Sequence, residues 1–128
     1  AKGYLFTVGD EDVPENLNAS DILKAFGSNV QSVPSNAELL SLIEARYHVF
    51  HIIAEEGSHA RSAANLRKMK MSWPALMGRR AIFMDDHTQF GNLILGIIRI
   101  NEGEDVDTVI DSFQDKRTKD SLTYGLKF

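Results

Sequence analysis

The fold is decided by a run near the middle of the chain, His48-Val49-Phe50-His51-Ile52-Ile53. The run is short, rich in β-branched and aromatic residues, and nearly continuous in hydrophobicity. This pattern is typical of a parallel strand covered on both faces, because a half-solvated strand alternates apolar and polar side chains. Two other runs share this character, Tyr4-Leu5-Phe6-Thr7-Val8 before it and Ala81-Ile82-Phe83-Met84 after it. The sequence therefore predicts a small parallel sheet.

Helical patterns separate and follow the three strands. Apolar residues recur at helical spacing in each, and capping residues, proline or glycine mark the ends. The first predicted helix is Asn18–Phe26 with Ser20 as N-cap, and the second begins with the capping box at Ser35 and runs to Tyr47. The third is Ala60–Met71, with a restart or kink at Pro74. The fourth is capped by Asp86 or Thr88 and ends at Gly103, and the fifth is Val106–Phe113. The tail Leu122–Phe128 alternates apolar with small or polar residues and is predicted to form a last edge strand.

The order of elements is thus β-α-α-β-α-β-α-α, with the tail as a further strand. Strands that alternate with helices imply right-handed parallel crossovers. We therefore expect a single α/β domain over residues 1–128, with a three-layer, Rossmann-like open sheet of mainly parallel strands flanked by helices. Three strands make a small sheet, so the chain resembles part of a larger α/β unit.

Composition excludes several classes of protein. The 128 residues include 14 Lys and Arg against 18 Asp and Glu, a net charge of −4, whereas dedicated nucleic-acid binders usually carry a basic excess. The absence of cysteine excludes a disulfide framework, a thiolate metal site and a cysteine nucleophile. No apolar run is long enough to cross a bilayer, and the first residues lack the architecture of a signal peptide. We expect a cytoplasmic protein with neither a nucleic-acid nor a membrane partner.

Acidic residues follow each predicted strand. They are Asp10, Glu11, Asp12, Glu55, Glu56, Asp85 and Asp86, and they are accompanied by His59 and His87. The carboxyl ends of parallel strands share one edge, where ligands bind in open α/β sheets. Because Mg²⁺ prefers oxygen ligands, the sequence predicts a Mg²⁺ site with Asp10, Glu55 and Asp85 as ligands. The alternative is that these acids cap the helices that start at this edge.

Sequence patterns of catalysis and of nucleotide binding are missing. No glycine-rich phosphate-binding motif occurs. No nucleophile lies at a sequence spacing from His59 or His87 that is typical of a catalytic pair. The sequence therefore predicts no catalytic and no cofactor-binding residue.

The remaining histidines and the tryptophan are expected to have structural roles. His48 and His51 lie three apart on one strand, so their side chains point to opposite faces and each is expected to be packed. Trp73 is expected to fill the core beside Pro74. The nearby methionines Met69, Met71 and Met77 are expected to join it.

One stretch has a family resemblance. Residues Lys2–Glu11 resemble the fourth strand and following loop of bacterial von Willebrand factor type A domains, and the order continues through Arg46–Ile53 and Trp73–Ile82 to the helix Phe90–Asn101. The resemblance implies a Rossmann-like sheet and a metal-ion-dependent adhesion site, in which Asp10 matches the aspartate after the fourth strand. The Asp-x-Ser-x-Ser motif of that site does not occur here. The chain therefore resembles the carboxyl-terminal half of the domain, with an incomplete adhesion site.

These observations favour a non-enzymatic module for protein–protein interaction or assembly. The strand Tyr4–Val8 would have an open, apolar edge, which we expect another copy, a partner chain or the tail Leu122–Phe128 to cover. Two alternatives use the acidic residues at the strand ends. One is a small Mg²⁺-dependent α/β enzyme acting on a phosphorylated substrate, and the other is a phosphoacceptor-type signalling domain. In the enzyme, the metal ligands would be Asp10, Glu55, Glu56 and Asp85, with His59 or His87 as base.

Overall fold

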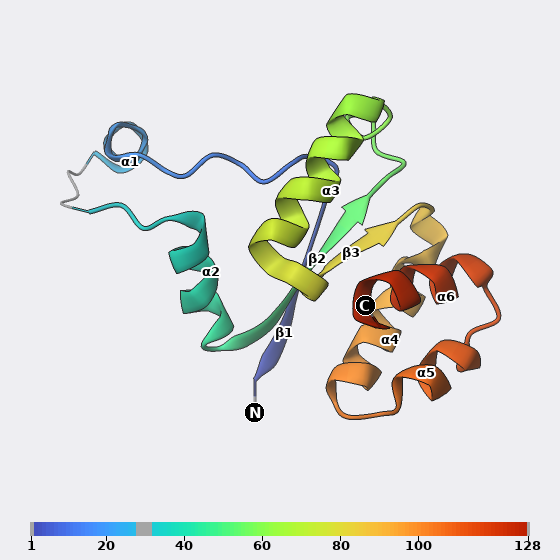
Figure 1. The fold of residues 1–128 in the computed structure, drawn as a ribbon. Helices are drawn as coiled ribbons and strands as arrows, with labels where there is room; N and C mark the ends of the chain where they lie inside the picture. Colours follow the sequence, from blue (N-terminus) through green and yellow to red (C-terminus); the bar gives the residue numbers. More distant parts are fainter. Residues whose placement is uncertain (1, 28–31, 128) are drawn as a thin grey trace.

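The protein is built on an open sheet of three parallel strands (Figure 1). The computed structural model describes residues 2–27 and 32–127. The strands are β1 (Gly3–Gly9), β2 (Tyr47–Ala54) and β3 (Ala81–Met84), in the order β1-β2-β3. Each lies within two residues of its predicted bounds, and the predicted α/β class with a parallel sheet is confirmed.

The register of the sheet sets which side chains share a face. Phe6 lies opposite Phe50, and Thr7 lies opposite His51. Because successive side chains of a strand point to opposite faces, Tyr4, Phe6 and Val8 of β1 share one face with Phe50 of β2. Leu5 and Thr7 share the other face with His51. His48 contacts Tyr4 on the first face and His51 contacts Trp73 on the second, as their spacing predicted.

One face of the sheet is covered by the crossover helices α2 (Asn36–Glu44) and α3 (Ala63–Met77). Buried side chains of β2, α3 and β3 form the core here, and Leu5, Leu40 and Trp73 pack at its margin. The buried members are Val49, Ile53, Ala60, Met69, Met77 and Ala81. Met71, which we expected in the core, is 69% exposed because it lies on the outer side of α3.

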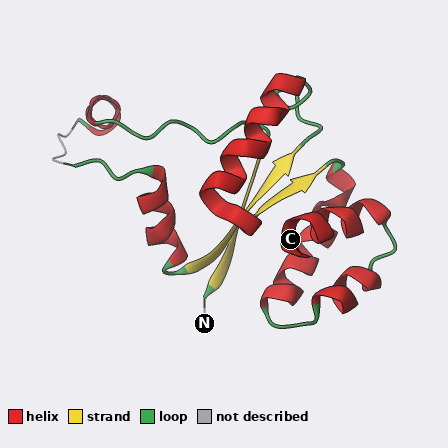
Figure 2. Ribbon diagram, in the orientation of Figure 1, coloured by secondary structure: helices red, strands yellow, loops and turns green. Residues whose placement is uncertain are grey.

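The opposite face is covered by three helices that follow β3 (Figures 1 and 2). They are α4 (Phe90–Asn101), α5 (Val106–Ser112) and α6 (Lys116–Leu122). Leu93 and Ile97 of α4 and Leu122 of α6 are fully or almost fully buried against Ile52 and Ile82 of the sheet. This is the larger of the two cores. Among the described residues, no helix is long and apolar enough to span a membrane.

Helix boundaries show where local patterns were misleading. The helix α1 (Ala19–Phe26) is capped by Asn18, whose side chain accepts from the Asp21 amide, and not by Ser20. Helix α2 begins after Ser35 as predicted but ends at Glu44, because Tyr47 already belongs to β2. Helix α3 is one continuous helix that contains Pro74, whose carbonyl accepts from the Gly78 amide. No restart of the helix occurs there.

The tail is helical, so the predicted edge strand is wrong. Helix α6, which the sequence analysis did not predict, leads into a π-helical turn at Thr123–Lys127; Phe128 lies outside the described residues. Leu122 is fully buried, and a Cβ added to Gly96 of α4 would come within 2.8 Å of its Cδ1 atom. Gly125 lies against Ile82 of β3 in the same way. Tertiary packing of these residues outweighs the short alternating pattern that suggested a strand.

Candidate functional site

Asp10 occupies the carboxyl end of β1, where the sequence placed it. Its Oδ2 atom accepts a hydrogen bond from the backbone amide of His59 at 3.1 Å. Its side chain also packs so closely on Gly57 that a Cβ there would collide with it. Asp10 thereby ties the loop after β1 to the loop after β2.

His59 lies beside Asp10 and pairs with a neighbouring acid. Its Nε2 atom is 3.6 Å from Oδ1 of Asp12, and its carbonyl accepts from Nδ2 of Asn65 at 3.1 Å. None of its hydrogen bonds in the described structure involves a hydroxyl group. Among the described residues, no hydroxyl group therefore lies within hydrogen-bonding distance of the His59 ring.

His51 is a buried imidazole between β1 and α3. It is only 4% exposed, its Nδ1 atom is 2.8 Å from Oγ1 of Thr7, and its ring stacks on Trp73 at 3.6 Å between centroids. Trp73 in turn donates from Nε1 to the carbonyl of Glu11 at 2.7 Å. Burial lowers the pKa of His51 to about 4, because the charged form loses its hydration. The imidazole is thus neutral at neutral pH, and its buried Nε2 atom has no hydrogen-bond partner among the described residues.

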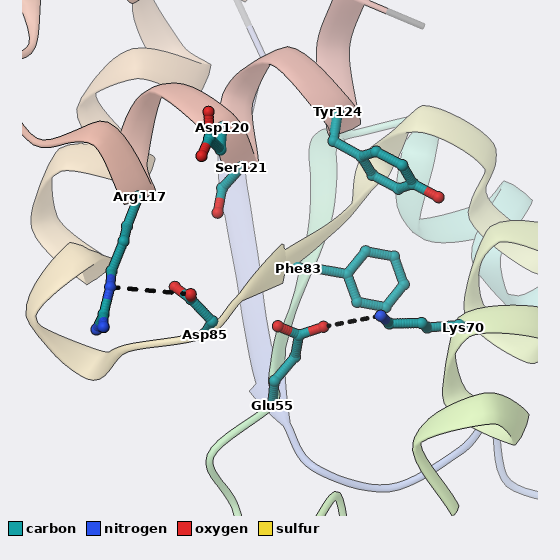
Figure 3. A pocket seen from close by; sticks show the side chains of 8 residues that line it. All are labelled: Glu55, Lys70, Phe83, Asp85, Arg117, Asp120, Ser121 and Tyr124. Atoms are coloured by element: carbon teal, nitrogen blue, oxygen red, sulfur yellow. Dashed lines mark ion pairs between the residues drawn. The ribbon is translucent and has the colours of Figure 1, made fainter. Parts of the chain in front are cut away.

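A second group of polar side chains surrounds a cavity of about 230 Å³ beyond β2 and β3 (Figure 3). Glu55 forms an ion pair with Lys70 of α3 at 3.3 Å, and Asp85 faces Arg117 of α6 at 3.9 Å. The aromatic rings of Phe83 and Tyr124 form the apolar wall, with Asp120 and Ser121 completing the lining. Each strand-end carboxylate here has a cationic neighbour.

The other acids at this edge have local partners. Asp86 caps the 3₁₀ turn His87–Gln89, and hydrogen bonds from Thr88 lower the pKa of its carboxyl group. Arg117 donates to Asp86 at 2.6 Å. Glu56 accepts from the backbone amide of His87 at 2.6 Å, and its Oε1 atom lies 2.8 Å from Nδ1 of the same residue. Asp86 thus has the capping role that the sequence analysis gave as its alternative, whereas the charge pairing of these acids was not predicted.

The structure brings two of the three predicted metal ligands together. Glu55 and Asp85 line the cavity of Figure 3, whereas Asp10 lines a different pocket with Trp73. Within residues 2–27 and 32–127, no group of three His, Asp or Glu side chains is placed to hold a metal ion. Mg²⁺ binding through Asp10, Glu55 and Asp85 stays a prediction.

The outer edge of β1 is a second candidate site. In the described part of the chain, β1 pairs with β2 alone, so its other edge presents unpaired backbone groups along Gly3–Gly9. Val8 is 47% exposed on this strand. The other edge strand, β3, is short and packs against the turn Thr123–Lys127. The tail therefore lies at β3, which rules it out as the cover for β1.

The crossover between β1 and β2 leaves apolar side chains uncovered. Neither α1 nor α2 has a fully buried residue. Phe26 of α1 is 80% exposed and Leu42 of α2 is 68% exposed. An apolar cavity of about 220 Å³ also lies between β1, α2 and α3, lined in part by Leu5, Leu40 and Trp73. The β1 side of the molecule is therefore less completely packed than the β3 side.

Comparison with known proteins identified no relative. No family model, no curated protein and no solved structure matches this chain.

Proposed function

We propose that this chain is a non-enzymatic module for protein–protein interaction or assembly, and that the open edge of β1 is its binding surface. The observation that carries the proposal is the position of β1. A strand of seven residues without a charged side chain lies at the edge of the sheet, with its outer backbone groups unpaired in the described structure. Such an edge favours addition of a further strand, which supplies the missing backbone hydrogen bonds.

The resemblance to the carboxyl-terminal half of a von Willebrand factor type A domain agrees with this proposal. Three parallel strands in sequential order, a tryptophan-containing helix between the second and third, and Asp10 directly after the first are the features that support it. In a domain of that kind, a further strand would lie beside β1. The adhesion site would be incomplete, because the sequence contains no Asp-x-Ser-x-Ser motif.

The direct test compares amide exchange and association state. We expect sedimentation of the purified chain to show concentration-dependent association, with amides of Tyr4–Val8 that exchange rapidly when dilute and slowly when associated. Val8→Lys introduces a charge on the half-exposed side chain of β1 and should weaken association. The matched control is Leu95→Lys, at a 51% exposed position on α4, which should leave it unchanged. A monomer at every concentration, with rapid exchange along Tyr4–Val8, would contradict self-assembly through β1 and would leave only a different protein as the partner of this edge.

The enzymatic alternative has its own test. A Mg²⁺ and Mn²⁺ titration followed by amide NMR reports on the residues that follow the strands. The sequence predicts a saturable shift at Asp10, Glu55 and Asp85, whereas the proposed function needs no metal. Since Lys70 and Arg117 already lie beside Glu55 and Asp85, we expect no saturable shift at millimolar metal. Saturable shifts at all three positions, abolished by Asp10→Ala, would instead favour a metal-dependent function.

A further inference from the structure

Two cavities of opposite character adjoin at Trp73. One, of about 400 Å³, lies beyond the carboxyl end of β1 and is lined mainly by acidic residues. The other, of about 220 Å³, is the apolar cavity between β1, α2 and α3. Val13, Pro14 and Trp73 line both of them. A molecule lying against Trp73 would therefore contact a charged surface at one end and an apolar surface at the other.

We propose that the two cavities together bind a small amine with an apolar tail, with the ammonium group in the acidic cavity and the tail in the apolar one. The inference goes beyond the proposed function, because it concerns a small molecule and does not use the open edge of β1. Three observations carry it: the charge of the first cavity, an unpaired imidazole nitrogen behind its wall, and the apolar lining of the second cavity.

The acidic cavity favours a cation. No lysine or arginine lines it, and its four carboxylates belong to Asp10, Glu11, Asp12 and Glu15. Asp10 accepts from the His59 amide, and Asp12 lies 3.6 Å from Nε2 of the same histidine. Within residues 2–27 and 32–127, the carboxylates of Glu11 and Glu15 have neither an ion pair nor a hydrogen bond. In the cavity of Figure 3, by contrast, lysine and arginine already lie beside two of the acids.

His51 is an independent sign that a hydrogen-bond donor is missing at this wall. It is 4% exposed, and its Nε2 atom has no partner in the described part of the chain. The Cε1–Nε2 edge of the ring faces Gly9, since a Cβ there would lie 3.5 Å from Cε1 and 3.9 Å from Nε2. Gly9 and Trp73, which stacks on the ring, both line the acidic cavity. With the Nδ1 proton donated to Thr7, Nε2 is an acceptor, and an ammonium group is the kind of donor it lacks.

The apolar cavity has room for a short tail. Its lining is apolar apart from Thr7, Asn36 and the indole N–H of Trp73. An engineered apolar cavity of about 150 Å³ in another protein takes up benzene, so about 220 Å³ can accept a short alkyl chain or a single ring. Burial of each methylene group should strengthen binding about fourfold.

Hexylamine is the probe, and the single tryptophan of the chain is the reporter. We would titrate hexylammonium chloride at pH 7 and follow the amide spectrum together with the indole N–H signal of Trp73. We expect saturable shifts at this signal and at the amides of Asp10–Val13. Butylamine, with two methylene groups fewer, should bind about 15-fold more weakly. Hexanoate, which has six carbons and the opposite charge, should give no saturable shift.

A substitution tests the acidic cavity separately. Glu11→Gln removes a carboxylate without a partner and should weaken hexylamine binding about two- to fivefold. The matched control is Asp111→Asn, at an exposed position on α5, which should leave the affinity unchanged.

Four results would overturn the inference. Equal binding of hexylamine and hexanoate would contradict a cation site, and equal binding of butylamine and hexylamine would contradict an apolar site for the tail. Absence of saturation by hexylamine at millimolar concentration, or shifts confined to the cavity of Figure 3, would contradict the proposed location. None of these results bears on association through β1, so they would leave the proposed function standing.

Discussion

The buried histidine makes folding stability depend on pH in a predictable way. His51 is 4% exposed and stacked on Trp73, and burial lowers its pKa from 6.5 to about 4. The folded state therefore keeps the imidazole neutral at pH values where the unfolded chain already binds a proton. The contribution is fully present above pH 6.5, the unfolded pKa. It is lost progressively as the pH falls towards the folded pKa, because the unfolded state then binds more protons.

The size of the effect follows from the two pKa values. The proton is excluded from the folded state over about 2.5 pH units, and each unit corresponds to about 1.4 kcal/mol. The free energy of unfolding should thus fall by about 3 kcal/mol between pH 7 and pH 4 through this residue alone. That is a large share of the stability of a small domain.

Urea unfolding of dilute protein at several pH values between 4 and 7 would measure the loss. His51→Phe is the matched variant, since it keeps a ring against Trp73 and removes the ionisation. We expect the stability of the variant to decline less steeply with acidification than that of the unsubstituted chain, by about 1 kcal/mol per pH unit near pH 5. Parallel declines in the two proteins would refute the reasoning, because His51 would then titrate alike in the folded and unfolded states.

Three further substitutions test the packing. Gly57→Ala should destabilise the fold by about 1–3 kcal/mol in urea unfolding, because the new Cβ collides with Asp10. Gly91→Ala in α4 is the opposite case. Apart from its chain neighbours and the nearby backbone of its own helix, no described atom lies within 4 Å of the new Cβ, so stability should rise by about 0.5 kcal/mol. Trp73→Phe removes the hydrogen bond to the Glu11 carbonyl and should lower the thermal midpoint, with a loss of about 1 kcal/mol or more. An unchanged midpoint would show that the loop after β1 is not held by the indole.

The strands were predictable because their signal is local. A run such as Ala81–Met84, apolar at every position, is compatible with burial on both faces and little else, and its bounds match the structure. The start of α2 was also predictable from its capping box, as the contact between Ser35 and the Glu38 amide shows. The tail was not predictable in this way. Leu122 is helical because it packs against Gly96, and that distant contact has no trace in the local pattern.

For the acidic residues at the strand ends, the sequence likewise predicts their position but not their partners. Topology places Glu55 and Asp85 at one end of the sheet, and the order of elements is enough to predict this. Their cationic neighbours Lys70 and Arg117 come from α3 and α6, and α6 was not predicted at all. Without those partners, the sequence overstates the negative charge of the cavity. Carboxylates at strand ends are therefore not enough to predict a metal site. The nearby cationic side chains must be known as well, and only the fold reveals them.

The composition of β1 does not match its position, and this is the strongest reason to expect a partner. An edge strand that stays unpaired in solution is usually short, charged or interrupted by proline, and β1 is none of these. Its residues are those of a strand inside a sheet, with Phe6 and Tyr4 packed on one face and Leu5 on the other. The helices α1 and α2, which follow it, lack a fully buried side chain. A second strand beside β1 would satisfy its backbone groups, and additional cover would shield the exposed apolar residues of the crossover. The incompletely packed half of the molecule is thus the half in which we place the interaction.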